Sequence, residues 1–275
     1  MSPSHDASAH ASSLSSVVLA VVLAMGLSGC FLVQEAAQTT VASASEAAGQ
    51  EVGEAIGARV ASAANLPTAG TAQWNRFMVT QAQVLFNYAF AANGMWPAEA
   101  TYEEGEWVRY EFRAGSEGEA GFQTLERAFL TTTEDGNEWW RVRAQQQEGD
   151  AWIYEALISP DREEVVRLRS KDPEGNVGEV PVTERTVYQS PQRLTEESID
   201  GATVGRENLD TPAGTFSTRK VEYAGGMGSG TVTWYLSEEV PGHVVRYRTQ
   251  GGQGQTWTST LTDYGSDATT TLDSY

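Results

Sequence analysis

The sequence has few of the groups that most catalytic sites use. It holds one cysteine and three histidines in 275 residues. Cys30 has no second cysteine to form a disulfide with, and once its thiol is modified it supplies neither a nucleophile nor a metal ligand. His5 and His10 lie near the start, so the rest of the chain has only His243, which lacks the partners that triads and histidine-ligated zinc require. We therefore expect a non-enzymatic protein with no metal site and no cofactor.

Positive charge is also scarce. The chain has 18 Lys and Arg against 37 Asp and Glu, a net charge of −19. Such a chain repels nucleic acids and anionic membrane surfaces. We expect no nucleic-acid partner, and we expect any attachment to a membrane to use a covalent lipid.

A short apolar run marks the N-terminal region. Residues 17–27 read VVLAVVLAMGL, eleven residues, whereas a membrane-spanning helix needs about 20. The length suits the hydrophobic core of a signal peptide. The sequence that follows, Leu27-Ser28-Gly29-Cys30, resembles the lipobox of bacterial lipoprotein precursors. This resemblance implies that residues 1–29 are removed and that Cys30 becomes the first mature residue, carrying a diacylglyceryl thioether and usually an N-acyl chain.

Two or three acyl chains make a stable membrane anchor, whereas one binds reversibly. Phe31 follows the cysteine, and the family's sorting rule, in which an Asp there retains the protein in the inner membrane, then implies the periplasmic side of the outer membrane. Residues 1–13 contain no Lys or Arg, although export signals normally begin with positive charge. An ordinary cleaved signal, with Cys30 incidental, and a short uncleaved anchor are the alternatives.

Residues 30–72 are predicted to be the lipidated cysteine and a tether rich in Ala, Ser and Gly. Apolar residues recur every four positions there, at Val52, Ile56 and Val60. A neighbouring row holds small residues: Gly49, Gly53, Gly57 and Ala61. The spacing indicates a partly helical segment, although glycine disfavours helix. It is either a spacer between lipid and domain or a surface for self-association.

Residues 73–265 are predicted to form one domain, followed by a polar tail over 266–275. Residues 73–93 have the pattern of an amphipathic helix, with Phe77, Leu85 and Tyr88 near one face and Gly94 as a stop signal. From 100 to 264, turn sequences separate segments of alternating polarity, which predicts antiparallel strands joined by hairpins. One face of these strands is apolar and aromatic. It offers candidate ligand-binding residues, namely Tyr110, Phe112, Trp140, Trp152 and Tyr154.

The order of strand and turn sequences carries a second resemblance. It rests on three segments, GEWVRY at 105–110, LDTPAGTF at 209–216 and WYLSEEVPGHVV at 234–245. They resemble a group of uncharacterised β-rich bacterial exported proteins whose curved sheet is similar to that of the periplasmic lipoprotein carrier and the outer-membrane lipoprotein receptor. The resemblance implies an α+β fold, a half-barrel-like antiparallel sheet with one packing helix. It also implies that the concave apolar face holds an acyl chain or lipid.

Two other groups of residues have a structural and a functional interpretation. The acidic clusters at 103–106, 134–138 and 196–200 lack the spacing of a calcium-binding loop, and solvated turns explain them. The pairs Arg141/Arg143, Arg167/Arg169 and Arg246/Arg248 could gather anionic headgroups or pair across strands with Glu111, Glu155 and other acids. We expect a non-enzymatic envelope lipoprotein that binds a lipid-like ligand; the alternatives are a scaffold with an envelope protein partner and a hydrolase with an unrecognised site.

The lipoprotein interpretation predicts the behaviour of Cys30→Ala. The substitution removes the only thiol that can accept a diacylglyceryl group, so we expect an uncleaved or a soluble exported protein. Membrane fractionation and the intact mass of the mature chain measure this. If the variant still fractionates with the outer membrane and matures to the same mass, Cys30 is not the anchor.

Overall fold

The computed structural model describes residues 70–90, 95–97, 100–114, 123–146, 150–159, 164–182, 192–224, 230–251 and 256–275. The chain divides into two compact units, Met1–Val41 and Ala42–Tyr275, and all described residues belong to the second. The predicted signal peptide, Cys30 and the tether up to residue 69 lie outside the described residues.

The described elements are two helices and thirteen strands. The helices are α3 (Ala72–Phe90) and α4 (Glu196–Ala202). The strands are β1 (Met95–Pro97), β2 (Trp107–Ala114), β3 (Gln123–Thr132), β4 (Glu138–Gln146), β5 (Trp152–Ile158), β6 (Val165–Lys171), β7 (Val177–Val180), β8 (Gln192–Leu194), β9 (Thr203–Thr211), β10 (Gly214–Ala224), β11 (Thr231–Leu236), β12 (Val244–Gln250) and β13 (Thr256–Gly265).

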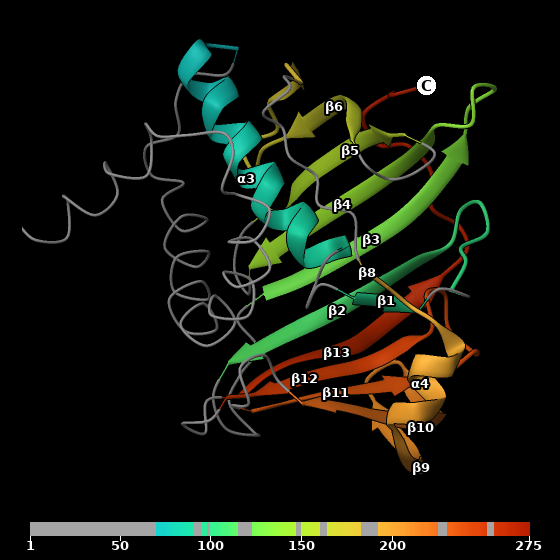
Figure 1. Ribbon diagram of the computed structural model, residues 1–275. Helices are drawn as coiled ribbons and strands as arrows, with labels where there is room; N and C mark the ends of the chain where they lie inside the picture. Colours follow the sequence, from blue (N-terminus) through green and yellow to red (C-terminus); the bar gives the residue numbers. More distant parts are fainter. Residues whose placement is uncertain are drawn as a thin grey trace, which may run out of the picture. The chain divides into compact units, whose positions relative to one another are not determined.

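Eleven strands form one antiparallel sheet in the order β7-β6-β5-β4-β3-β2-β13-β12-β11-β10-β9. Neighbours along the chain are mostly neighbours in the sheet, and the joint is β2 against β13, which brings the two halves of the domain together. β1 and β8 form a separate parallel pair. Figure 1 shows α3 against one face of the sheet and α4 beside β10. The predicted fold class, α+β with a curved antiparallel sheet and a packing helix, is confirmed.

Helix α3 forms where the sequence predicts a helix, and residues 91–93 of the predicted segment lie outside the described residues. The Thr71 hydroxyl accepts a hydrogen bond from Trp74 N at 3.2 Å, which satisfies one of the free amides at the helix start. Apolar residues at helical spacing are buried along one side: Trp74, Met78, Ala82, Leu85, Phe86, Ala89 and Phe90. This stripe packs on the sheet and stabilises a helix that has no acidic residue in its first turn and no basic residue in its last.

Alternation along the strands divides the sheet into two faces. We call the face that carries Tyr110, Trp140 and Tyr154 and lies under α3 the inner face, and the opposite one the outer face. The predicted alternation holds in β2, β4 and β5. In β6 it fails for Val166, which is 49% exposed, because the pairing shifts by one residue between Leu157 and Ile158 of β5. Neither helix of the described chain is both long and apolar enough to cross a bilayer.

Residues 209–216, where Pro212 and Gly214 indicate a tight turn between two strands, form a hairpin. Thr211 pairs with Gly214, so Pro212 and Ala213 form a two-residue connection between β9 and β10. Gly214 has a φ of +136°, a backbone conformation that residues with a Cβ rarely adopt. The nearest atom to a Cβ built there belongs to the Phe216 ring at 3.8 Å, so the requirement for glycine is conformational rather than steric.

The hairpin geometry predicts that Gly214→Val destabilises the protein by about 1 to 3 kcal/mol, because a β-branched residue resists this φ. Urea unfolding measures the loss. Gly205→Val on the neighbouring strand is the matched control, since Gly205 has an ordinary φ and open space around it; we expect it to change stability by less than about 0.5 kcal/mol. Equal losses in both variants would show that the turn does not need glycine.

Candidate functional site

The structure places all five predicted ligand-binding residues on the inner face, and all five are buried. Their exposed fractions are 8% for Tyr110, 4% for Phe112, 0% for Trp140, 1% for Trp152 and 0% for Tyr154. They belong to one apolar cluster that joins both halves of the sheet. In this conformation the rings form a packed layer between α3 and the sheet, and contact with a ligand stays a prediction.

Aromatic side chains of α3 fill this layer from the other side. The ring of Phe77 lies 5.8 Å from Trp152 and that of Phe86 lies 6.4 Å from Tyr154. Phe90, the last helical residue, meets Trp140 edge-on at 5.1 Å. Edge-on and tilted ring pairs each add roughly 0.5 to 1.5 kcal/mol beyond burial. The layer is therefore closed by contacts along the whole helix.

A buried arginine lies at the C-terminal end of α3. Arg127 of β3 is on the inner face because its register partners are Val108 and Val142. Its guanidinium donates to the Ala89 carbonyl and, at 2.5 Å, to the Tyr102 hydroxyl. A cation there is favoured by the negative end of the helix dipole, so the contact fixes α3 on the sheet. Arg127 was not predicted from the sequence. Its position two residues after the buried Leu125, which puts both side chains on the same face of the strand, was the available signal.

The phenol of Tyr154 is the polar group at the centre of the layer. Its hydroxyl donates to Gln81 Oε1 of α3 at 2.8 Å. Burial raises the pKa of Tyr154 well above its ordinary value, and the nearby Asp172 carboxylate raises it further. The hydroxyl therefore keeps its proton and acts as a hydrogen-bond donor. Burial alone also raises the pKa of Tyr88, near the end of α3, to about 12.

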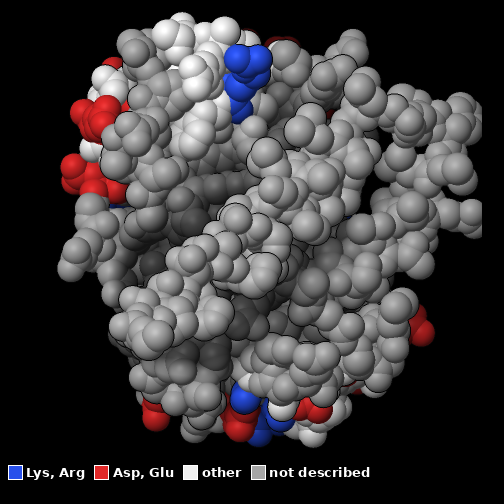
Figure 2. All heavy atoms as spheres, turned by 90° about the vertical axis from the view of Figure 1, so that its left-hand side faces the viewer, with Lys and Arg blue, Asp and Glu red and all other residues white. Residues whose placement is uncertain are grey.

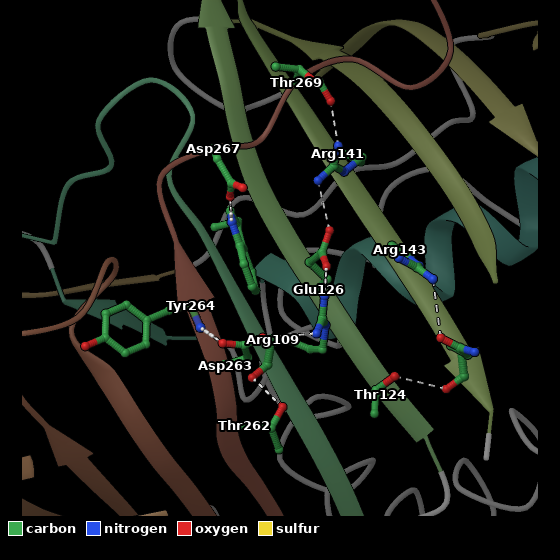
Figure 3. A network of polar contacts seen from close by, with 12 residues as sticks. Arg109, Thr124, Glu126, Arg141, Arg143, Thr262, Asp263, Tyr264, Asp267 and Thr269 are labelled. Atoms are coloured by element: carbon green, nitrogen blue, oxygen red, sulfur yellow. Dashed lines mark hydrogen bonds and ion pairs between the residues drawn. The ribbon is translucent and has the colours of Figure 1, made fainter. Parts of the chain in front are cut away.

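The outer face carries a network of charged side chains (Figure 3). Glu126 of β3 accepts from Arg109 of β2 at 2.7 Å and from Arg141 of β4 at 3.0 Å. Arg109 also pairs with Asp263 of β13 at 3.3 Å, across the joint between the two halves of the sheet. Glu126 is nearly buried, with 6% of its side chain exposed. Two arginines compensate the cost of burying that carboxylate.

Residues 266–275, which we call the C-terminal strap, lie across the outer face of β4, β5 and β6. Arg141 donates to the Thr269 carbonyl at 2.5 Å and Arg167 to that of Ser274 at 3.1 Å. Leu272 is buried. The ring of Tyr275 lies 6.1 Å from that of Trp139. The sequence predicts this segment only as a polar tail; the structure shows that it is bound along its length.

The strap surrounds Glu155, a carboxylate with no exposed surface. Glu155 accepts hydrogen bonds from Thr270 Oγ1 at 2.7 Å, Thr271 N at 2.6 Å, Thr271 Oγ1 at 3.1 Å and Ser274 Oγ at 2.5 Å. Hydrogen bonds to a charged group contribute about 1.5 to 3 kcal/mol each. Four donors from one short segment make Glu155 the main polar anchor of the strap.

The structure shows hydrogen-bond and ion-pair partners for the arginine pairs Arg141/Arg143, Arg167/Arg169 and Arg246/Arg248. Arg141 and Arg167 form cross-strand ion pairs, as one interpretation predicts, but with Glu126 and Glu179. The expected pairing with Glu155 is wrong, because its oxygens face the strap. Arg246 donates to Thr260 Oγ1 at 3.2 Å. Glu111 pairs with Arg113 of its own strand at 2.7 Å rather than across the sheet.

The predicted acidic clusters lie in turns and at helix ends. Glu106 accepts from the Glu103 amide at 2.7 Å, and Glu196 and Asp200 of α4 both pair with Arg219. Figure 2 shows described Asp and Glu side chains at the left and lower margins of the face that it presents. Within the described part of the chain, no three His, Cys, Asp or Glu side chains come together as a metal site would require.

No family model and no curated protein matches the chain. Among solved structures, it aligns with the crystal structure of MucB at 10% identity and a TM-score of 0.36, over 64% of this chain and 58% of MucB. The MucA/MucB complex of Pseudomonas aeruginosa gives 11% identity, a TM-score of 0.37 and coverage of 61% and 53%. The chain thus spans less than two thirds of these relatives.

A putative exported protein with a YmcC-like fold from Bacteroides fragilis aligns at 12% identity and a TM-score of 0.31, over 60% of this chain and 98% of that one. At these scores the likenesses carry no argument about function. The function proposed below therefore rests on the residues described above.

The strap predicts a large effect of Glu155→Gln. An amide keeps one acceptor oxygen and presents an NH2 group to the strap's own donors, so we expect a loss of about 2 to 4 kcal/mol and faster amide exchange in residues 268–275. Glu179→Gln is the matched control, because that carboxylate is 49% exposed in its pair with Arg167, and exposed pairs contribute about 0 to 1 kcal/mol. Similar effects of the two substitutions would show that Glu155 does not hold the strap.

Proposed function

We propose that this chain is a non-catalytic, lipid-anchored protein of the cell envelope that binds an amphipathic, acyl-containing molecule in the layer between α3 and the inner face. The anchor is the lipid on Cys30, and the location is the periplasmic side of the outer membrane. No cofactor takes part.

The aromatic layer between α3 and the sheet is the observation that supports ligand binding. Among the described residues, the helix α3 bounds it on one side and strands continuous with the rest of the sheet bound it on the other. An acyl chain entering it exchanges water for contact with Trp152, Phe77 and their neighbours, which is favourable by about 25 cal/mol per Å² of apolar surface. Entry requires α3 to separate from the sheet, which breaks the Arg127–Ala89 and Tyr154–Gln81 hydrogen bonds as well as the ring contacts along the helix.

A scaffold role in an envelope complex is the second candidate. It is favoured by the outer face, which already binds an extended polypeptide, the C-terminal strap, through arginines that donate to carbonyl groups. A partner's extended segment could be bound by the same chemistry on neighbouring strands. In that case the inner layer is ordinary core and takes up no ligand.

Trp152→Ala tests ligand binding in the layer. Trp152 is 1% exposed, so we expect the ligand-free variant to lose about 3 to 5 kcal/mol. A bound acyl probe fills the space that the indole leaves, and a ligand that binds only the folded state stabilises it by mass action. The variant should therefore regain more stability with the methyl ester of parinaric acid than the parent gains. Urea unfolding with and without the probe measures both.

Trp139→Ala is the control, because Trp139 is equally buried, at 2% exposure, but lies on the outer face under the strap. It should lose comparable stability and gain nothing from the probe. If the parent takes up no probe and neither variant is rescued by it, the carrier role is wrong and the scaffold role is the better account.

A further inference from the structure

Three polar atoms of the apolar layer have no hydrogen-bond partner anywhere in the described chain. They are Trp74 Nε1 and Gln81 Nε2 of α3 and Ser170 Oγ of β6. The exposed fractions of these residues are 1%, 7% and 0%. A buried polar atom without a partner costs about 1 to 3 kcal/mol, and most folded proteins have few of them. Three such atoms under one helix therefore need an explanation.

The strand register places Ser170 between two residues that α3 contacts, Tyr154 and Gly178. On the inner face, Tyr154 pairs with Ser170 of β6, and Ser170 pairs with Gly178 of β7. The indole of Trp74 lies over Gly178, where Trp74 Cη2 would be only 3.1 Å from an added Cβ. The amide of Gln81 reaches Tyr154 through its oxygen, which leaves its NH2 group in the same layer. The row Tyr154–Ser170–Gly178 is thus covered by Trp74 and Gln81.

We infer that this row binds a neutral carbonyl oxygen of an acyl ligand, such as that of an ester or an amide, at Trp74, Gln81 and Ser170. The inference rests on the proposed function and names the polar end of its ligand. The indole N–H and the amide NH2 can only donate, and the serine hydroxyl can donate as well. A partner for any of these atoms can therefore be an acceptor, which fits a carbonyl oxygen and not an ammonium group.

The charge nearby favours a neutral acceptor over a carboxylate. Asp172 follows β6 and is 1% exposed. Its oxygens accept from Asn176 N and Asn176 Nδ2, both at 2.9 Å, and its negative charge is felt at the Tyr154 hydroxyl, whose pKa it raises. A second anion placed beside Tyr154 would be repelled by Asp172. An uncharged carbonyl gains the free donors without that cost.

The test compares two probes of the same chain length, parinaric acid methyl ester and parinaric acid, on the full chain with Cys30→Ala. That substitution removes the protein's own acyl groups from the assay. We expect the ester to bind about 10-fold more tightly than the acid. Trp74→Phe and Ser170→Ala each delete an unpartnered atom, and we expect a roughly 5- to 10-fold loss of ester affinity and unchanged acid affinity. Ser170→Ala removes a single oxygen that has no partner, so its melting temperature without ligand should rise or stay equal. Trp74→Phe also leaves part of the indole's space empty, which offsets that gain.

Trp234→Phe is the matched control. It deletes another buried indole N–H without a partner, on β11, six strands away from β5 in the sheet. We expect it to leave the affinities of both probes unchanged. Equal affinities for the ester and the acid would overturn this inference. So would a loss of ester affinity in Trp234→Phe equal to that in Trp74→Phe. Either result leaves the proposed function standing. Ester binding that survives both Trp74→Phe and Ser170→Ala means that ordered water alone satisfies these atoms, and it also overturns the inference. If neither probe binds, the proposed function itself is wrong.

Discussion

The inner face of the sheet carries a row of aromatic side chains that water solvates poorly, and the rest of the domain is arranged around covering it. α3 does so over β3 to β7, with seven buried residues on one stripe. Burying one large side chain contributes about 1.5 to 3 kcal/mol, so the helix is held by its packing more than by its own propensity. Arg127 then fixes the helix end by donating to Ala89. A protein that opened this layer would have to break both the apolar stripe and that contact.

On the outer face, buried carboxylates rather than apolar rings need partners. Glu126 is compensated by arginines of the two adjacent strands, so the sheet itself supplies the partners. Glu155 is compensated by the strap, whose hydroxyls and one amide converge on it. A buried carboxylate without such partners is strongly destabilising. The last ten residues of the chain are therefore part of the fold, because they complete the polar face of β4, β5 and β6.

Structural features that depend on residues a few positions apart could be predicted from the sequence. Two-residue alternation identified the inner-face residues of β2, β4 and β5, and turn residues placed the Pro212–Ala213 connection, because both depend on neighbours a few positions apart. The strap was missed because its contacts join residues more than 100 positions apart, and a Ser- and Thr-rich segment has no periodicity. Glu155 was assigned to cross-strand arginines for the same reason. The strand pattern predicts which face of the sheet its side chain lies on, but its hydrogen-bond partners in the strap follow only from the tertiary structure. The five inner-face rings were placed on the correct face, but the sequence could not show how completely α3 would bury them.

Buried polar atoms without a hydrogen-bond partner in the described chain occur on both faces, but they differ in kind. On the outer face they include Arg141 Nε and Arg169 Nε, and these two guanidinium groups donate through other nitrogens to Glu126 or to the strap. On the inner face, Trp74 and Ser170 have no other polar side-chain atom. An alanine at position 170 would nearly preserve the packing and avoid the cost of leaving a polar group unpaired, and a large apolar side chain could fill the position of Trp74 without a donor. A core that needs only to be stable gains nothing from those donors, whereas a layer that receives an acyl carbonyl gains its orientation from them. The unpaired donors thus separate a binding layer from an ordinary core more sharply than the aromatic rings do, since rings serve both equally well.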